Sequence, residues 1–288
     1  YKVLQEASIK VIDVSEYTKF PEIMNGRVKT INPLIGGGLL GLRDEHENDA
    51  KKNNIQWIDL VICNLYPFAE ATSKENCDEA LALENIDIGG PTMIRAAAKN
   101  LGWVCVAVDP NDYTNIADEL KTTGKISFES RKSFSAKAFG HTAKYDTIIH
   151  NYFKSEKLSE DFSLTFTKHS DLRYGENPHQ SAAAYKVSEG KDYNILNAHI
   201  HQGKKLSYNN IMDADGALAC VKEFDKPACV IVKHANPCGV AIGKNVLEIY
   251  SRAFKADSLS AFGGIVAFNQ KCTKEVAQEI TSVFVEIV

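Results

Sequence analysis

A lysine and a histidine stand side by side at the end of a short apolar run. Residues 229–232 read Cys-Val-Ile-Val, and Lys233 and His234 follow directly. Such a run of branched apolar residues predicts a buried strand, and α/β folds commonly build sites where buried strands end. A partly desolvated lysine can lose its proton near neutral pH, where histidine already titrates, so this pair suits proton transfer.

The alternative is a structural role, in which these two side chains only cap a strand at the surface. This is the commoner case for two such residues alone. Two further stretches favour a site. Residues 172–180 read Leu-Arg-Tyr-Gly-Glu-Asn-Pro-His-Gln, and residues 257–264 read Asp-Ser-Leu-Ser-Ala-Phe-Gly-Gly. Both are rich in turn-forming residues and carry side chains suited to ligands.

These stretches resemble the bifunctional purine-biosynthesis family that joins AICAR formyltransferase to IMP cyclohydrolase, and the resemblance covers essentially the whole chain. It implies the last two steps of IMP synthesis. A formyl group passes from 10-formyltetrahydrofolate, a reduced folate, to AICAR ribonucleotide, and the product FAICAR is then cyclised to IMP with loss of water.

The resemblance also implies an α/β fold in two parts. Residues 1–158 are expected to form a methylglyoxal-synthase-like, Rossmann-like domain with a parallel sheet. Residues 159–288 are expected to form the first part of a cytidine-deaminase-like α/β transferase domain. Chains of this family are longer at both ends, so we expect a phosphate loop before Tyr1 and further folate-binding residues after Val288.

For formyl transfer, the amine must lose its proton as it attacks, and the oxyanion must be held. By resemblance, Lys233 and His234 do this work. We assign proton removal to His234 and donation to the oxyanion or the leaving folate nitrogen to Lys233, with the reverse division left open. Arg173 and Tyr174 suit a phosphate and ribose clamp. The substrate-binding residues expected for this site are Arg173, Tyr174, Gly175, His179, Asn210, Asp257, Phe262 and Gly263.

Ring closure needs an acid, a group that orients the amide, and cations for a phosphate. Four short motifs match the family in order and spacing: Gly-Arg-Val-Lys-Thr, Cys-Asn-Leu-Tyr-Pro-Phe, Asp-Ile-Gly-Gly and Arg-Ala-Ala-Ala-Lys-Asn. Taken singly, each residue is more often structural, as when a lysine complements a helix dipole. The catalytic residues that the resemblance implies are Lys29, Tyr66, Asp87 and Lys99, with Arg27, Thr30 and Asn64 beside the nucleotide.

Two positions depart from the family pattern. The family usually has histidine where this chain has Asn32 and Gly36. Neither replacement can shuttle a proton. We interpret the lost histidines as structural or substrate-orienting. If those histidines took part in proton transfer, this chain would lack cyclohydrolase activity.

The elements that must position these residues alternate between strand and helix, which predicts a parallel α/β sheet in the first part. Strands are expected at 9–14, 57–68, 104–110, 162–168, 182–185, 195–199 and 265–268, and a helix capped by Thr92 is expected at 92–100. Further helices are expected at 111–122, 128–153, 213–222 and 245–255. Asn-Pro and then Gly at 236–239 predict a tight turn after the Lys-His pair, and the charged residues 154–161 are the best linker.

Bulk composition excludes other classes of function. The chain has 288 residues, 44% of them hydrophobic and 24% charged, and its net charge of −4 does not favour a nucleic-acid partner. No apolar run reaches the ~20 residues that span a bilayer, so no membrane partner is expected. Seven scattered cysteines, never spaced Cys-x-x-Cys, favour a reducing compartment, which we take as the cytoplasm, and disfavour structural zinc.

Two other functions compete with the bifunctional enzyme. A zinc deaminase would need His-x-Glu followed by Pro-Cys-x-x-Cys, whereas Pro237-Cys238 is followed by Gly-Val-Ala. A nucleotide-binding regulatory module would bind AICAR ribonucleotide without turnover. The resemblance further implies a homodimer and no catalytic metal, and it leaves open a bound potassium ion.

Overall fold

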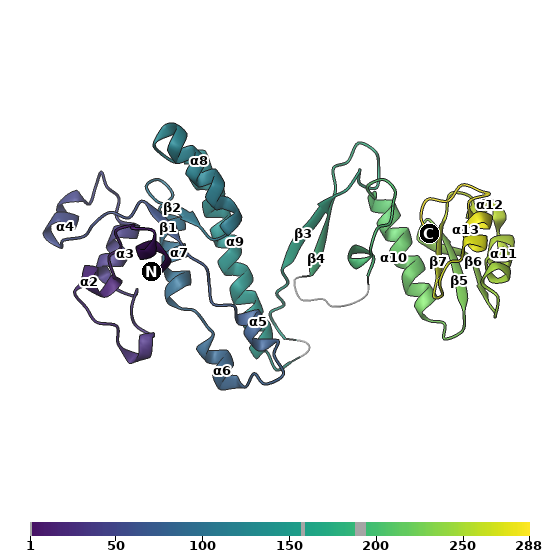
Figure 1. Cartoon of the computed structure of the whole chain (residues 1–288), viewed down its shortest axis with the longest axis horizontal. Coiled ribbons are helices and arrows are strands. Elements are labelled where there is room, and N and C mark those ends of the chain that lie inside the picture. The colour runs from purple at the N-terminus through teal and green to yellow at the C-terminus, as the bar shows by residue number, and fades with distance from the viewer. Residues whose placement is uncertain (1, 157–158, 188–193) are drawn as a thin grey trace. The chain divides into compact units, whose positions relative to one another are not determined.

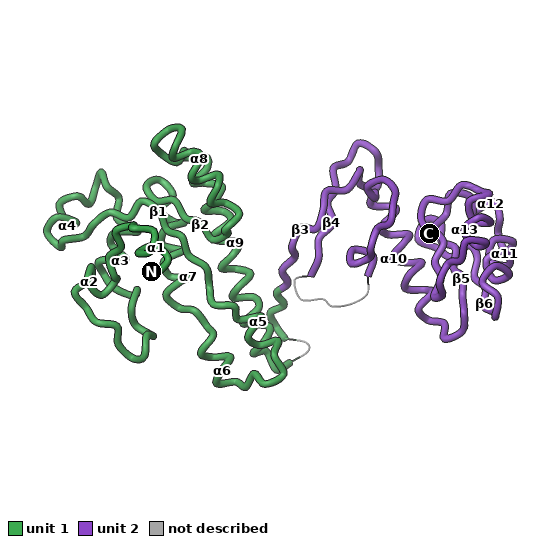
Figure 2. Tube along the Cα trace, in the orientation of Figure 1, with its two compact units in different colours: residues 1–163 green, residues 164–288 purple. Residues whose placement is uncertain are grey.

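The computed structural model describes residues 2–156, 159–187 and 194–288. The chain divides into two units, Tyr1–Ser163 and Leu164–Val288 (Figure 2). The boundary expected from the sequence lies between residues 158 and 159, and residue 158 is outside the described residues. Each unit has its own buried clusters of apolar side chains, and each is therefore described by itself.

The first unit is mainly helical (Figure 1). Its elements are α1 (Lys2–Glu6), α2 (Val14–Thr18), the 3-10 turn η1 (Met24–Gly26), α3 (Pro33–Leu40), α4 (Glu47–Lys52), β1 (Leu60–Ile62), α5 (Phe68–Thr72), α6 (Glu79–Glu84), α7 (Gly89–Lys99), β2 (Cys105–Ala107), η2 (Pro110–Asp112), α8 (Tyr113–Thr123) and α9 (Phe128–Phe153). β1 and β2 are parallel, with Val61 beside Val106. The parallel pairing expected from the alternation of strands and helices is therefore present.

The core of the first unit lies where α3, α7 and α9 cover this strand pair. Leu39 of α3, Ile94 of α7 and Val106 of β2 are almost fully buried in one cluster. Helix α9 begins at Phe128 because Ser127 accepts the Ser130 N–H, which satisfies one of the free donors at the helix start. The Arg131 guanidinium then donates to the carbonyls of Leu101, Gly102 and Ile126. These bonds fix the start of α9 on the loop that leads into β2.

The second unit contains an antiparallel hairpin and a three-stranded sheet. Its elements are β3 (Phe166–Asp171), β4 (Ala183–Val187), η3 (Ile195–Asn197), α10 (Tyr208–Lys222), β5 (Ala228–Lys233), β6 (Asn236–Ile242), α11 (Val246–Ala256), α12 (Ser258–Ala261), β7 (Ile265–Phe268) and α13 (Lys274–Ile280). β3 pairs with β4, and the sheet has the order β6-β5-β7 with both neighbours antiparallel to β5.

Strand β5 is buried on both faces. Val230 and Val232 pack with α10, whereas Cys229 and Ile231 pack with α11 and α13. Because side chains alternate between the faces of a strand, a central strand covered on both sides must be apolar at every position. Gly239 of β6 allows α11 to approach, since a Cβ there would lie 2.1 Å from the Ala253 carbonyl oxygen.

Several elements expected from the sequence differ in the structure. Residues 9–13 form no strand and lead into α2, and the strand expected at 57–68 is limited to Leu60–Ile62. The strand expected at 195–199 is the 3-10 turn η3. Helix α7 begins at Gly89, so Thr92 does not cap it and its hydroxyl instead donates to the Ile88 carbonyl.

The tight turn expected at 236–239 is also wrong. Asn236, Pro237 and Gly239 belong to strand β6, and the chain reverses one step earlier, at His234 and Ala235. Pro237 is tolerated because β6 is an edge strand of the sheet, where one row of backbone groups has no partner strand.

Two candidate active sites

The lysine–histidine pair lies at the end of β5 and in the turn that follows. His234 and Ala235 form a two-residue turn between β5 and β6, and both have positive φ, 51° and 60°. Such turns match the twist of a hairpin and usually contain Asn-Gly. The Asn236 side-chain amide donates to the His234 carbonyl at 2.8 Å. The turn therefore presents an exposed imidazole from a fixed backbone.

The Lys233 ammonium is held by backbone carbonyls of the loop after α12. Its Nζ donates to the oxygens of Gly263 at 2.8 Å and Phe262 at 3.1 Å. Gly263 has φ +66°, and a Cβ there would lie 3.0 Å from that Nζ. An ammonium has three N–H donors, and two are used among the residues that the structure describes, so one is left for a substrate oxygen. The structure thus brings together Lys233, Phe262 and Gly263, which the sequence analysis places in one site.

The Arg-Tyr-Gly loop follows strand β3. The Arg173 guanidinium lies over the Tyr174 ring, 4.8 Å from its centroid, and donates to the Tyr174 hydroxyl at 3.1 Å. The Gly175 N–H donates to the Gln180 carbonyl at 2.9 Å, which closes the loop, and His179 is exposed within it. Arg173 is exposed as well, so its guanidinium is accessible to an anion.

Helix α10 connects this loop to the hairpin turn. At its start, the Tyr208 N–H donates to the Tyr174 carbonyl at 3.1 Å, and the Asn209 side chain donates to the Glu176 carbonyl at 3.0 Å. One turn later, the Asp213 carboxylate accepts the Ala235 N–H at 2.7 Å. Residues four apart lie on the same side of a helix. One face of α10 therefore holds the Arg-Tyr-Gly loop and the Lys-His hairpin, two of the three stretches that the sequence indicates.

Two other predicted binding residues have local structural contacts. The Asn210 amide oxygen accepts the Ser207 N–H, and the Ser207 hydroxyl accepts the Asn210 N–H, which together cap α10. Asp257 caps α12 by accepting the Ser260 N–H at 3.0 Å, and the Ser260 hydroxyl, together with this backbone bond, lowers the pKa of the Asp257 carboxyl. Asp257 thereby fixes the short helix that leads to Phe262.

In the first unit, Asp87 lies at the start of α7. Its Oδ1 accepts the Gly90 N–H at 2.8 Å, so the carboxylate itself occupies one of the free amides of the helix start. A Cβ on Gly90 would lie 2.5 Å from Asp87 Oδ2, so the contact requires glycine. Thr30 lies against the neighbouring Gly89, where a Cβ would be 2.4 Å from the threonine hydroxyl. The structure therefore brings Thr30 and Asp87 to the same helix end.

Two cations of the first site, Lys29 and Arg27, are paired with carboxylates. Lys29 Nζ lies 2.8 Å from Glu22, whose hydrogen bond and charge raise the pKa of Lys29, and nearby Tyr66 has a weaker effect in the same direction. Arg27 pairs with Glu84. Tyr66 is 55% exposed, and Asn64 accepts a hydrogen bond from the Tyr113 hydroxyl at 3.5 Å. Lys29 and Tyr66 are both accessible at the surface.

Lys99 is not brought to this group. It is exposed at the last position of α7, ten residues after Gly89. A rise of about 1.5 Å per residue separates the two positions by roughly 15 Å. In that last turn the positive charge complements the helix dipole, which is the structural role considered for it from the sequence.

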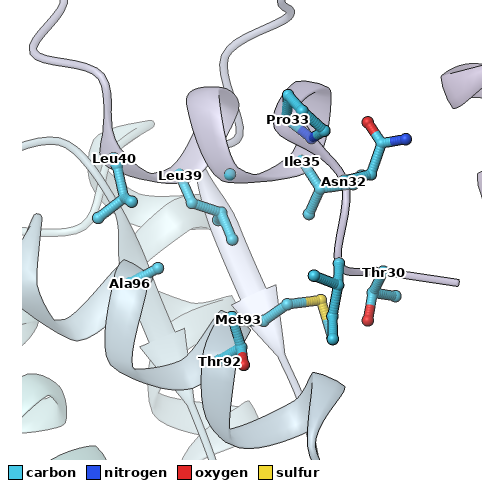
Figure 3. A pocket seen from close by; sticks show the side chains of 11 residues that line it. Thr30, Asn32, Pro33, Ile35, Leu39, Leu40, Thr92, Met93 and Ala96 are labelled. Atoms are coloured by element: carbon cyan, nitrogen blue, oxygen red, sulfur yellow. The ribbon is translucent and has the colours of Figure 1, made fainter. Parts of the chain in front are cut away.

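A pocket of ≈ 280 Å³ lies between α3 and α7 and is lined mainly by apolar side chains (Figure 3). Figure 3 shows Leu40 at one end and Thr30 at the other. Both positions that depart from the family pattern line it. Asn32 caps α3 by accepting the Leu34 N–H at 2.9 Å, and a Cβ on Gly36 would meet no atom within 4 Å. Thr30 belongs to the candidate site and also lines this pocket, so the pocket adjoins the site. An apolar lining does not suit a phosphate, so the pocket is not the anion-binding part of the site.

Within the described residues, no group of three or more His, Cys, Asp and Glu side chains is arranged to hold a metal ion. Over the same residues, no helix combines the length and apolar character needed to cross a membrane. All seven cysteines are free. Burial raises the pKa of the Cys229 thiol to about 12, as expected for a cysteine that packs as a small apolar residue.

Two residues that hold these sites are not among those predicted from the sequence. Asp213 gives no signal until the hairpin turn is known, because its partner is a backbone amide 22 positions away. Tyr145 does have a signal in the sequence, because it continues the buried stripe of α9, which consists of Ser135, Ala138, Thr142 and Tyr145. A buried tyrosine needs a partner for its hydroxyl. Here the hydroxyl accepts the Asp87 N–H at 2.8 Å and donates to the Asn85 carbonyl at 3.1 Å.

Comparison with known proteins shows which family models and relatives the chain matches. The family model "AICARFT/IMPCHase bienzyme" matches residues 97–288, and the model "MGS-like domain" matches residues 1–92. Among curated relatives, "Bifunctional purine biosynthesis protein PurH" of Acetivibrio thermocellus is 51% identical over 100% of this chain. The protein of that name from Bacillus mycoides is also 51% identical over the whole chain. The chain spans 57% of the length of each.

Among solved structures, "Crystal structure of ForH" is 32% identical, with a TM-score of 0.48, and the match covers 53% of this chain and 80% of that one. The MGS-like model accounts for residues 1–92, at the start of the chain. The bienzyme model covers well over half of the residues, including both the Arg-Tyr-Gly loop and the Lys-His hairpin. This chain therefore belongs to the AICARFT/IMPCHase bienzyme family.

Proposed function

We propose that the protein of which this chain is part carries out the last two steps of IMP synthesis. It transfers the formyl group of 10-formyltetrahydrofolate to AICAR ribonucleotide, and it then closes the ring of FAICAR to give IMP and water. The observation that carries the proposal is the arrangement around α10, which holds the Lys233–His234 hairpin and the Arg173–Tyr174 loop on one helix face.

In formyl transfer, the amine nitrogen of AICAR attacks the formyl carbon. His234 accepts the proton that the amine loses, and the free N–H of Lys233 donates to the developing oxyanion. The carbonyls of Phe262 and Gly263 orient the ammonium for this role. The tetrahedral intermediate then collapses, the leaving folate nitrogen takes up the proton held by the Lys233–His234 pair, and tetrahydrofolate is released. Arg173 and Tyr174, with Gly175 and His179, hold the nucleotide.

In ring closure, the carboxamide nitrogen attacks the formyl carbon and water leaves. We propose that Asp87 orients the amide, and that Lys29 and Tyr66 face the oxygen and the nucleotide from the same surface. Arg27, Thr30 and Asn64 lie beside the nucleotide. Lys99 is proposed from the resemblance alone, since a helix length separates it from Asp87.

The remaining parts of the proposal come from the resemblance. Residues 1–158 would form the cyclohydrolase domain and 159–288 the first part of the transferase domain. The protein would act as a homodimer in the cytoplasm, where seven free cysteines are expected. No catalytic metal is proposed. Whether a potassium ion is bound would be read from the dependence of activity on potassium concentration.

The test uses the complete protein and two substrate sets. AICAR ribonucleotide with 10-formyltetrahydrofolate reports formyl transfer, and FAICAR supplied alone reports ring closure. Turnover of both supports the proposal. Transfer without closure would mean that Asn32 and Gly36 cannot replace the usual histidines. Binding of AICAR ribonucleotide with no turnover would favour a regulatory module, and one zinc per chain would favour a deaminase.

A further inference from the structure

We infer that Tyr145 is a positioning residue for ring closure, because it sets the backbone from which Asp87 projects. This inference rests on the proposed cyclohydrolase function. Tyr145 belongs to none of the motifs that carry the family resemblance, and it lies 58 positions after Asp87 in the sequence. Its contact with the site arises only from the fold.

The Tyr145 hydroxyl joins the two ends of a short connection. It accepts the Asp87 N–H at 2.8 Å and donates to the Asn85 carbonyl at 3.1 Å. Asn85 and Asp87 lie between the end of α6 and the start of α7. The Asn85 N–H still bonds carbonyls of α6, whereas the Asn85 carbonyl and the Asp87 N–H are past the helix end, and Tyr145 provides their partner. Burial raises the pKa of Tyr145, so its hydroxyl keeps the proton that it donates to Asn85.

Asp87 is therefore held at two points. Tyr145 holds its backbone N–H, and the Gly90 N–H holds its Oδ1. Within the described residues, Asp87 Oδ2 has no hydrogen-bond donor, so this oxygen is the one available to a substrate amide. A catalytic group gains from such support because a shift of about 1 Å can lower a rate about 100-fold.

Helix α9 is a firm support for this hydroxyl. Near its start, Arg131 donates to three backbone carbonyls. Two turns before Tyr145, Lys137 Nζ lies 2.7 Å from Asp109 and 2.8 Å from Asp112, which fixes the helix on the loop after β2. Tyr145 itself is only 8% exposed. The position of α9 therefore determines the position of the Asp87 backbone.

The experiment is a double-mutant cycle in the complete protein, with FAICAR as substrate. Tyr145→Phe removes only the hydroxyl. We expect kcat for ring closure to fall about 10- to 100-fold and KM to change less than about twofold, because the group acts through Asp87 and not on substrate binding. Tyr152→Phe is the matched control on the same helix, since its hydroxyl has no hydrogen bond within the described residues, and kcat should stay unchanged.

The second arm repeats Tyr145→Phe in an Asp87→Asn background. If Tyr145 acts through Asp87, the hydroxyl deletion should have little further effect there, because residues that act as a unit are not additive. The same fold-loss in both backgrounds would overturn the inference. So would a lowered melting temperature with unchanged kcat, which would mean a structural role only.

If the proposed function itself were wrong, the wild-type protein would not cyclise FAICAR. This result differs from failure of the Tyr145 inference, in which the wild type cyclises FAICAR normally. Amide hydrogen exchange would still decide the inference. Faster exchange at Asp87 in Tyr145→Phe than in Tyr152→Phe would support the positioning contact. Equal exchange in the two variants would overturn it.

Discussion

In the second unit, Lys233 and His234 are neighbours in the sequence, and a two-residue turn and two carbonyls of one loop set their geometry. In the first unit, Lys29, Tyr66 and Asp87 come from three separate segments, and Asp87 depends on a glycine of α7 and a tyrosine of α9. The local site should therefore lose activity mainly when a chemical group is removed. The assembled site should also lose it when a distant contact is removed.

The largest expected effect is in the local site. Lys233→Ala should lower kcat for formyl transfer about 1,000-fold, since removing an oxyanion donor typically costs 10²–10³ and the variant also uncovers the Gly263 carbonyl. Ring closure of supplied FAICAR should be unchanged. Lys244→Ala, at an exposed lysine after β6, is the control. Equal loss of both half-reactions would show that the variant disturbs the whole protein.

A glycine pair tests the assembled site. Gly90→Ala would push a methyl group to 2.5 Å from Asp87 Oδ2 and 2.8 Å from Leu65, so ring closure should fall about 100-fold while formyl transfer persists. Gly36→Ala, in α3, meets no atom within 4 Å and should leave closure within about twofold. Steady-state rates of both half-reactions check this. Similar losses in the two variants would contradict the role given to the Asp87–Gly90 contact.

A smaller effect is expected at the helix that joins the two motifs of the second unit. Asp213→Ala removes the carboxylate that accepts the exposed Ala235 N–H, and a hydrogen bond to a charged group contributes about 1.5–3 kcal/mol. We expect kcat for formyl transfer to fall about 10-fold, since about 1.4 kcal/mol is a factor of ten. Asp213→Asn keeps a carbonyl oxygen at this position and should restore most of the rate. If Asp213→Asn did not restore the rate, the negative charge of Asp213, and not its acceptor oxygen, would be the property that formyl transfer requires.

The smallest effect is expected from Arg173→Lys. The variant keeps the positive charge but loses the planar fork that binds phosphate at two points and lies over the Tyr174 ring. The KM for AICAR ribonucleotide should rise about 5-fold with kcat nearly unchanged, a loss of about 1 kcal/mol of uniform binding. A fall in kcat at constant KM would place Arg173 in the chemistry and not in nucleotide binding.

The sequence predicts well where local signals agree. The helix expected at 128–153 and the strand expected at 265–268 have these bounds in the structure, because a serine cap and a branched apolar run each specify one outcome. It fails at 236–239, where Asn-Pro and Gly are turn residues by composition but lie in β6. The chain reverses at His234-Ala235, a pair with no turn signature, because the pairing of β5 with β6 overrides local preference.

For the sites, the motifs predict which residues matter but not what holds them. The grouping of Lys233 with Phe262 and Gly263 could be expected from the family order. The contacts of Asp213 and Tyr145 could not, since each joins a side chain to a backbone amide far away in the sequence. Such pairings depend on how helices pack, and packing is decided by the whole fold.

The left-handed backbone of His234 has a consequence for binding. A non-glycine residue in this region is disfavoured by about 1–2 kcal/mol, so the surrounding hairpin must impose it. The hairpin therefore fixes the direction in which the His234 Cα–Cβ bond projects, and less backbone freedom is left to lose when a nucleotide arrives. An Ala235→Gly exchange would relieve strain and stabilise the hairpin, yet it would widen the range of directions in which the imidazole points. Greater stability and weaker preorganisation would then result from the same substitution.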